Sequence, residues 1–294
     1  MMLSDISSTI MEVSKTLQRV NMYPFFDAAH YILMCSIVKE DTAQSAGTSA
    51  FSRRHPFACW LASMLMCFSG SILGNLLIGE SLVTPFKHHK DILLATAIWY
   101  VINYFPFDLA YKLAKFAPMH LVVCIVKEVH RTRKIYDGVG VAYKLYPNAY
   151  LIVIAIGVVK GSGYLEMRLF ERLIRGIWIP ASNEFLQPSF ATKASVFISL
   201  AFLLEKIGNV PSTHENIFLG AIMFLVYFKL SSMIIGIHDP FLPFENIFCS
   251  LFLGGLADAL KRATTSGKPI QASAAPNNNG SSSTAGKTKE KKNE

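Results

Sequence analysis

A cluster of charged residues lies at the end of an apolar run, and its members have the spacing of one helical face. Residues 118–126 form the run, and residues 127–134 (KEVHRTRK) follow it. Lys127, Arg131 and Lys134 are four and three positions apart, which places their side chains on the same side of a helix. Charges in hydrocarbon are costly, so such a cationic face indicates an anionic ligand or the lining of a polar cavity.

The depth of Lys127 is the first test of that interpretation. It lies about nine residues from Pro118, which is roughly 13 Å along a helix. In a membrane-spanning helix, this depth is too large for a simple anchor at the helix end. The structural alternative is an ion pair with Glu128, Glu166 or Asp108, or a side chain that extends to the membrane interface. The spacing alone leaves both open.

Glycines in two apolar stretches are candidates to complete the site. One stretch offers Gly157, Lys160, Gly161 and Gly163, and the other offers Gly70 and Gly74, which are four residues apart. A helix break in the first stretch would expose backbone N–H groups that approach phosphate oxygens closely. The second pair indicates either close helix packing or a break beside a cavity.

The composition predicts that these residues belong to a membrane protein. Of the 294 residues, 52% are hydrophobic and only 16% are charged, whereas soluble domains carry about 25% charged residues. The mean hydropathy is +0.36. The apolar residues fall in blocks of roughly 20, the length needed to cross a bilayer. We therefore predict an all-α membrane protein with seven transmembrane helices.

The seven predicted spans are separated by connections that include polar loops. They cover about 23–38, 56–79, 91–110, 118–136, 147–173, 187–207 and 215–237. Pro106 predicts a kink or an early stop in the third span, with Asp108 beside it. The sequence Asp-Gly-Val-Gly at 137–140 is typical of a turn after the fourth span. A last apolar piece, 245–260, is short for a span and is expected to pack on the bundle or lie at the interface.

The order of the spans predicts an internal repeat. Two groups of three helices, about 22–112 and 117–208, each have a glycine-bearing middle helix, and a seventh helix follows. Because three crossings are an odd number, two consecutive copies have opposite orientations. Inverted repeats with paired interrupted helices are typical of transport sites near the membrane midplane. The transmembrane domain is thus predicted at 21–260, after a polar lead at 1–20.

The rest of the chain bears on orientation and partners. Residues 261–294 are rich in Ser, Gly, Asn and Lys and are predicted to be a disordered basic tail. The formal net charge of +8 indicates anionic lipid surfaces rather than nucleic acid. Basic residues occur on both sides of the bundle, so the positive-inside rule is weak here. The basic tail favours a cytosolic C-terminus and hence a luminal N-terminus.

Signatures of enzymes and metal sites are missing from the sequence. The histidines form no HExxH pair, and neither a GxSxG motif nor a phosphate-binding Walker loop occurs. The five cysteines lie in apolar blocks without CxxC spacing, which indicates small buried side chains rather than zinc ligands. We predict no catalytic residues and no metal cofactor.

Several segments resemble one known family. Lys127-Glu128-Val129 with Arg131 is similar to the KEV motif of the trimeric intracellular cation channels of the endoplasmic and sarcoplasmic reticulum. Further segments that resemble the family are Tyr104–Leu109 (YFPFDL), Lys229–Ser232 (KLSS) and Asp239–Phe241 (DPF). The resemblance covers about residues 20–260.

The resemblance implies a function and a set of ligands. It implies a homotrimer with a pore in each protomer, conducting potassium to offset charge when calcium leaves the store. It also implies bound phosphatidylinositol 4,5-bisphosphate, held by Lys127 and Arg131 with help from the fifth helix at Gly161 and Gly163. In that setting Gly70, Gly74, Pro106, Asp108, Gly157 and Lys160 are pore or kink candidates, and the glycine pair favours a break.

Two other classes of protein remain as alternatives. The same inverted repeat is typical of secondary transporters, which periodicity alone does not separate from channels. An intramembrane lipid-modifying enzyme would need acid–base or metal-ligand pairs within the spans, and none is evident.

Overall fold

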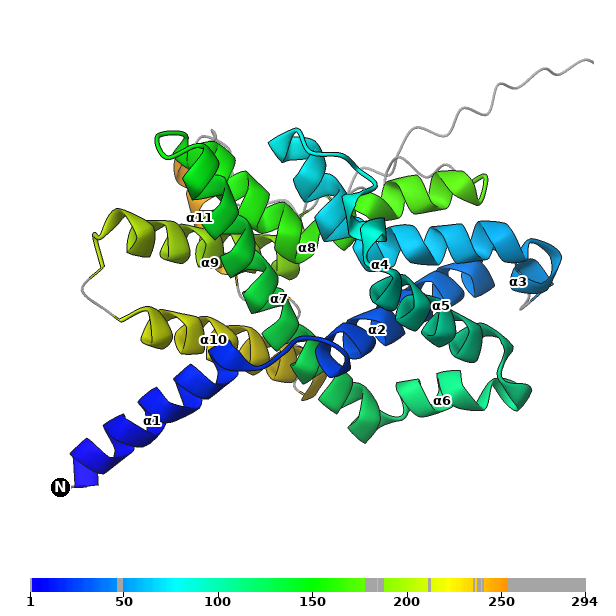
Figure 1. Cartoon of the computed structure of the whole chain (residues 1–294), viewed down its shortest axis with the longest axis horizontal. Helices are drawn as coiled ribbons and strands as arrows, with labels where there is room; N and C mark the ends of the chain where they lie inside the picture. The colour runs from blue at the N-terminus through cyan, green and yellow to red at the C-terminus, as the bar shows by residue number, and fades with distance from the viewer. Residues whose placement is uncertain are drawn as a thin grey trace, which may run out of the picture. The chain divides into compact units, whose positions relative to one another are not determined.

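The chain folds into a series of helices (Figure 1). The computed structural model describes residues 2–46, 50–177, 184, 188–210, 213–234, 236, 239 and 241–252. No strand occurs among these residues, so the predicted all-α class is confirmed for the part of the chain that is described. The predicted basic tail at 261–294 lies outside it.

The helices match most of the predicted apolar stretches. They are α1 (Met2–Arg19), α2 (Phe25–Ala46), α3 (Ala50–Arg54), α4 (Pro56–Ile78), η1 (Thr84–Lys87), α5 (His89–Tyr104), η2 (Pro106–Asp108), α6 (Leu109–Lys115), α7 (Ala117–Leu145), α8 (Tyr150–Ile174), α9 (Phe190–Ile207), α10 (His214–Ile234) and α11 (Leu242–Phe252). The polar lead is helical as α1. A first compact unit ends at Leu242, and all but the first residue of α11 belong to a second unit.

Membrane-crossing character is clearest in three helices. By length and composition, α4, α8 and α10 are long and apolar enough to cross a bilayer, and the bent pair α5–α6 makes a fourth if it counts as one span. The helix α7 has 29 residues but carries a charged cluster at its centre. The predicted count of seven spans therefore remains a prediction.

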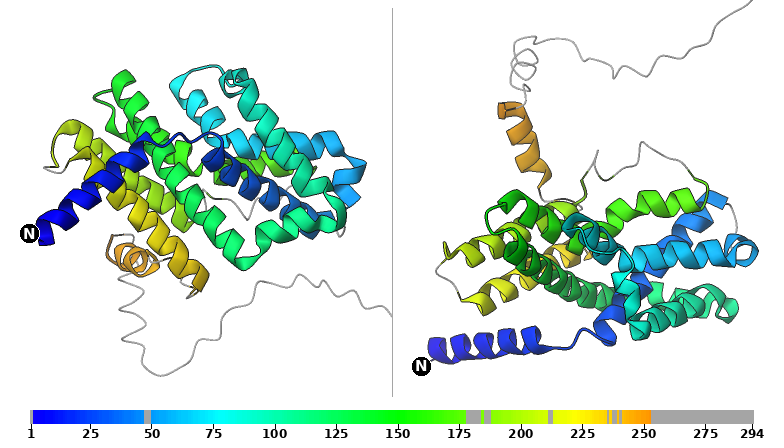
Figure 2. Two further views of the ribbon diagram at one scale, coloured as in Figure 1. Left: turned by 60° about the horizontal axis from the view of Figure 1, so that its bottom comes forward. Right: turned by 45° about the horizontal axis from the view of Figure 1, so that its top comes forward.

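Two apolar cores hold the helices of the first unit together. One is built mainly from α2, α4 and α5, around Met34, Met64 and Met66. The other is built from α7, α8, α9 and α10, around Phe202 and Phe218. The helices α4 and α8 lie against each other and join the two groups (Figure 2). The predicted repeats and their inverted relation stay a prediction.

The glycine-bearing helices are continuous, so the predicted breaks in α4 and α8 are wrong. Both helices run through their glycines without a change of secondary structure. A Cβ atom at Gly70 would lie 2.6 Å from the backbone oxygen of Lys160, and one at Gly163 would lie 3.2 Å from Cα of Gly70. The glycines allow two backbones to approach closely, which is the packing alternative of the sequence analysis.

The predicted turn at 137–140 is also wrong, because α7 continues through it to Leu145. Gly138 is buried in the helix and faces the side chain of Lys160 and the carbonyl of Ile156. A glycine in this position serves close packing, and the energy of that contact outweighs its low helix propensity. The chain turns at residues 146–149 instead.

The predicted interruption at Pro106 is present. The helix α5 ends at Tyr104, and the axis turns by 93° between α5 and the segment Pro106–Lys115. Phe107 and Asp108 have φ values of 57° and 55°, which are rare for residues with a side chain. The Lys39 ammonium donates to the carbonyl oxygen of Ile102 at 2.7 Å and lies 2.8 Å from Oδ1 of Asp108. The contacts of Lys39 fix the end of α5 and the start of α6.

Candidate functional site

The charged cluster of α7 is buried in the protein interior. The exposed fractions of Lys127, Glu128 and Arg131 are 8%, 2% and 5%. Ordinary surface lysines and arginines remain in water, so burial of three charged neighbours requires local partners. The burial follows from the packing of α7 between α2 and α8, which both contact it.

The partners of this cluster come from α7 itself and from α8. Nη1 of Arg131 lies 2.8 Å from Oε2 of Glu128, and its Nη2 donates to the Tyr164 hydroxyl at 3.3 Å. The Lys127 ammonium lies 4.0 Å from the centre of the Tyr164 ring, in a cation–π contact. Lys127 therefore has an aromatic partner, whereas Arg131 has a carboxylate partner.

Two cavities meet at this cluster. Cavity 1 has a volume of about 190 Å³, and cavity 2 has a volume of about 410 Å³. Both are lined by Lys127, Arg131 and Tyr164. We call these three residues the shared wall.

The cavities follow each other along the helices that line them. On α7, cavity 2 is lined between His120 and Arg131, and cavity 1 between Lys127 and Lys134. On α2, cavity 1 is lined by residues 27–31 and cavity 2 by residues 33–37. The same order holds on α8, where Tyr164 contributes to both. The shared wall therefore separates two consecutive compartments along one helix direction.

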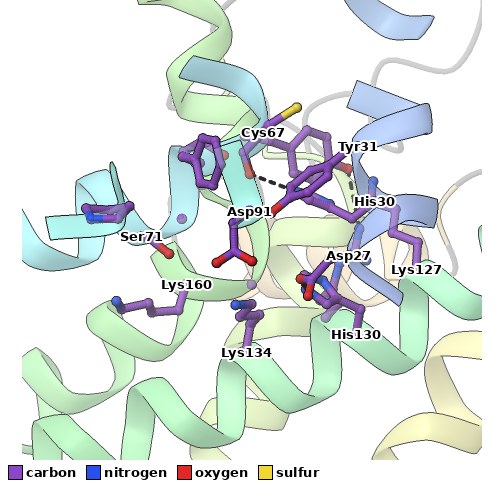
Figure 3. Close-up of a pocket in the computed structure, with 18 of the residues that line it drawn as sticks. Asp27, His30, Tyr31, Cys67, Ser71, Asp91, Lys127, His130, Lys134 and Lys160 are labelled. Atoms are coloured by element: carbon purple, nitrogen blue, oxygen red, sulfur yellow. Dashed lines mark hydrogen bonds and ion pairs between the residues drawn. The ribbon is translucent and has the colours of Figure 1, made fainter. Parts of the chain in front are cut away.

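Cavity 1 is also lined by one carboxylate and two imidazole side chains, from Asp27, His30 and His130. Their spacing in the sequence does not reveal that they lie together. Nε2 of His130 lies 3.0 Å from Oδ1 of Asp27, and the rings of His130 and His30 stack with centroids 5.0 Å apart. His30 donates from Nε2 to the Cys67 carbonyl at 3.0 Å. Figure 3 shows the Asp27 carboxylate beside the His130 ring, and the Asp91 carboxylate on the side of the cavity where Lys134 and Lys160 lie.

The chain is similar in sequence to a family of known proteins. A profile of TRIC channels matches residues 45–236. Trimeric intracellular cation channel type 1B.1 of Caenorhabditis elegans is 47% identical over 275 residues, covering 93% of this chain and 92% of that protein. The human type A channel is 37% identical over 244 residues, covering 83% and 80%. The chain belongs to the TRIC channel family.

Solved TRIC structures have the same fold. A trimeric intracellular cation channel from C. elegans, solved in the absence of Ca²⁺, is 43% identical and superposes with a TM-score of 0.74 over 79% of this chain and 99% of that one. A structure described as a TRIC counter-ion channel in calcium release is 37% identical, with a TM-score of 0.71 over 76% and 99%. The resemblance predicted from the KEV motif is confirmed, and this TRIC family member is a membrane channel protein rather than an enzyme.

The structure brings most of the predicted site residues of this TRIC channel together. Lys127, Arg131, Gly161 and Gly163 all line cavity 1, as do Gly70 and Lys160. Gly74 contacts Lys160 just outside that set, and Gly157 packs against Ser199 and Val139. Because α8 is continuous, the N–H groups of Gly161 and Gly163 lie within a helix rather than in an unwound segment.

The alternative partners of Lys127 are placed elsewhere in this TRIC channel. Glu128 pairs with Arg131, and Asp108 pairs with Lys39 near the bend. Asp108 lines a smaller cavity of about 60 Å³ beside the bend, apart from the shared wall. Oε2 of Glu166 is buried without a hydrogen-bond partner among the described residues. The structural alternative of an ion pair between Lys127 and Glu166 or Asp108 is therefore not present among the described residues, and Glu128 is a near neighbour that pairs with Arg131.

The remaining basic residues of the α7 cluster have separate positions in this TRIC channel. Arg133 donates from Nη1 to the carbonyl of Gln18 at 2.8 Å, and its Nε lies 3.3 Å from Oδ2 of Asp137. It thus joins α7 to α1. Lys134 lines cavity 1. No group of three or more His, Cys, Asp or Glu side chains suited to a metal ion occurs in the described ranges of the chain.

Proposed function

We propose that this chain forms a potassium-conducting cation channel of the endoplasmic or sarcoplasmic reticulum, assembled as a homotrimer with a pore in each protomer. In this role it supplies counter-ion current during calcium release. The observation that carries the proposal is a pair of adjoining cavities along α2, α7 and α8, with charged side chains in the wall that they share. The names of the relatives support the trimer, the cation and the calcium-release role.

The charge of cavity 2 supports phosphatidylinositol 4,5-bisphosphate as a ligand at Lys127 and Arg131. Gly161 and Gly163 line cavity 1 instead, so they are not part of this proposed lipid site. Its lining carries four basic residues, Lys115, Lys127, Arg131 and Lys229, against one acidic residue, Glu128. Of the basic residues, Lys115 pairs with Glu40 and Arg131 with Glu128. A phosphate group offers the remaining two ammonium groups a strong anionic partner.

Two buried hydroxyls add to this proposed phosphate site. Oγ of Ser36 and Oγ of Ser189 line cavity 2 and have no hydrogen-bond partner among the described residues. A buried hydroxyl without a partner is costly, and a phosphate oxygen accepts its hydrogen bond. Cavity 2 also includes Ser232 near the end of α10, the end from which the chain continues toward the tail predicted to be cytosolic. A cytosolic opening suits a phosphoinositide headgroup.

The test combines lipid binding with single-channel recording. Replacing Lys127 by Met removes an ammonium group that has an aromatic partner and no carboxylate partner in the described chain, so the Arg131–Glu128 pair is retained. We expect phosphoinositide binding to vesicles to fall roughly tenfold, with a parallel change in potassium current. Lys112, which is exposed and lines neither cavity, gives the matched control Lys112→Met. Unchanged lipid binding in Lys127→Met would contradict the assignment of Lys127.

The secondary transporter remains the second candidate, because the predicted inverted repeat suits it as well. The same recordings separate the two. Discrete unitary potassium currents far above about 10³ ions per second exceed the turnover of proteins that change conformation for each substrate. Transport only below that rate, without unitary steps, would favour the carrier.

A further inference from the structure

Lys160 is held in place by glycines from two neighbouring helices. Its side chain leaves α8 between Gly74 of α4 and Gly138 of α7. A Cβ at Gly74 would overlap Cε and Cδ of Lys160, and a Cβ at Gly138 would lie 2.9 Å from its Cγ and 3.0 Å from its Cβ. The two glycines form a slot that fits the aliphatic part of one lysine, and we call it the lysine slot.

The lysine slot leads the ammonium group to an uncharged partner. Nζ of Lys160 donates to Oδ1 of Asn75 at 3.3 Å. Asn75 is itself buried near the end of α4, and its amide group donates to the carbonyl of Ser81 at 3.4 Å. Within the described residues no carboxylate lies within ion-pair distance of Lys160. The ammonium group is therefore held in position by a neutral amide rather than by a direct ion pair.

The same lysine lines cavity 1 next to the connection between α4 and α5. Pro85 and His88 of that connection line the cavity together with Lys160. In Figure 3 the Lys160 side chain extends away from Lys134 toward the side on which Ser71 lies. The shared wall is at the other limit of cavity 1, where it adjoins cavity 2. Lys160 thus sits in the part of the proposed conduction path farther from cavity 2.

We propose that Lys160 is a fixed positive charge that limits the entry of cations into cavity 1 from the α4–α5 side, and that the lysine slot exists to hold it there. This inference rests on the proposed channel function. A fixed charge near a path repels ions of its own sign and lowers their local concentration. One unit charge about 10 Å away in water changes that concentration about twofold.

Salt dependence separates this role from a structural one. The Debye length is about 30 Å at 0.01 M salt and about 3 Å at 1 M salt. In planar bilayers with potassium current entering from the cavity 1 side, we expect Lys160→Met to conduct about twofold more than wild type at about 0.01 M. At about 1 M the two conductances should agree. Methionine keeps the unbranched apolar chain in the lysine slot, so the packing is retained.

Two further variants test whether the lost charge of Lys160 causes the change in conductance. Lys144→Met removes a basic residue at the exposed end of α7, outside cavity 1, and should match wild type at both salt concentrations. Gly74→Ala displaces the far end of the Lys160 side chain, which is flexible. It should alter the low-salt conductance in wild type and have no effect in Lys160→Met, because the charge that it moves is then absent.

The outcomes distinguish this inference from the proposed function. A wild-type protein that gives no cation current in bilayers would reject the channel proposal. A wild-type current that Lys160→Met leaves unchanged at low salt would reject only the role of Lys160. A conductance change of the same size at both salt concentrations would show a packing effect and would also overturn it.

Discussion

The α4–α8 crossing and the α5–α6 bend both contain residues that disfavour helix, and their structures differ. At the crossing, Gly70 and Gly163 lie in continuous helices whose backbones nearly touch. At the bend, Pro106 follows a helix end, and the chain direction changes by 93°. Glycine keeps its N–H group and can remain in a helix, whereas proline loses that donor and clashes with the preceding turn.

The two regions also differ in what stabilises them. The crossing is held by close backbone contact and by the apolar cores on either side. The bend is held by polar contacts from α2: Lys39 reaches Ile102 and Asp108, and Glu40 accepts from the Tyr111 hydroxyl at 3.0 Å. The crossing should therefore respond to added volume, and the bend to lost polar groups.

The largest effect is expected at the crossing. In Gly70→Ala, the new methyl group meets the Lys160 carbonyl, which belongs to a helix backbone and has little freedom to move. Overpacking of this kind costs about 1–3 kcal/mol of unfolding free energy. Gly140→Ala in α7 is the matched control, because no atom lies within 4 Å of its Cβ position. Thermal unfolding in detergent should show a clear loss for the first and none for the second. Equal stability of the two variants would contradict the close crossing.

An intermediate effect is expected at the bend. Lys39→Met removes the donor to Ile102 and the partner of Asp108, whose side chain is 48% exposed. Water screens the exposed carboxylate, so the lost backbone hydrogen bond dominates, and the cost is about 1 kcal/mol. Protease cleavage between α5 and α6 should become faster than in wild type. Lys112→Met provides the comparison in α6, and cleavage rates that do not differ between the two would argue against the role of Lys39.

The smallest effect is expected from the backbone of the bend. Phe107 has a φ of 57° and a side chain that is 92% exposed. Glycine adopts this conformation without the steric cost of a Cβ atom, although it also loses more entropy on folding. Phe107→Gly should therefore raise the unfolding free energy by less than about 1 kcal/mol. A loss of stability measured by the same thermal assay would mean that the Phe107 side chain contributes to packing.

Features of the fold that depend on local residue types can be predicted from the sequence, whereas those that depend on contacts between distant segments cannot. The all-α class, the interruption at Pro106 and the cationic face of α7 depend on local residue types, and local rules predict them. The continuity of α4 and α8 depends on a second backbone that fills the space beside Gly70, which a single segment does not reveal. For the same reason the Asp-Gly-Val-Gly segment at 137–140 predicts a turn by local rules, although Gly138 packs inside α7.

Some residues of the candidate site can likewise be predicted from the sequence, and others cannot. Lys127 and Arg131 are evident from their spacing, because both lie on one helix. The roles of Asp27 and Lys39 are not evident from the sequence, because both residues lie on α2 and their partners lie on other segments. Asp27 contacts His130 and Lys39 contacts Asp108 only in the folded chain. Their partners are 103 and 69 residues away in the chain. An isolated acidic or basic residue in an apolar stretch was the only signal available for either.

The shared wall has a consequence for how the two compartments respond to their contents. Lys127, Arg131 and Tyr164 face cavity 1 and cavity 2 at once. An anion bound in one compartment therefore changes the field that an ion experiences in the other. Thermodynamic linkage makes such coupling reciprocal: if the bound anion favours a cation across the wall, that cation raises the affinity for the anion by the same factor. In the proposed channel, the permeating ion is then also an effector of the proposed ligand in the neighbouring compartment.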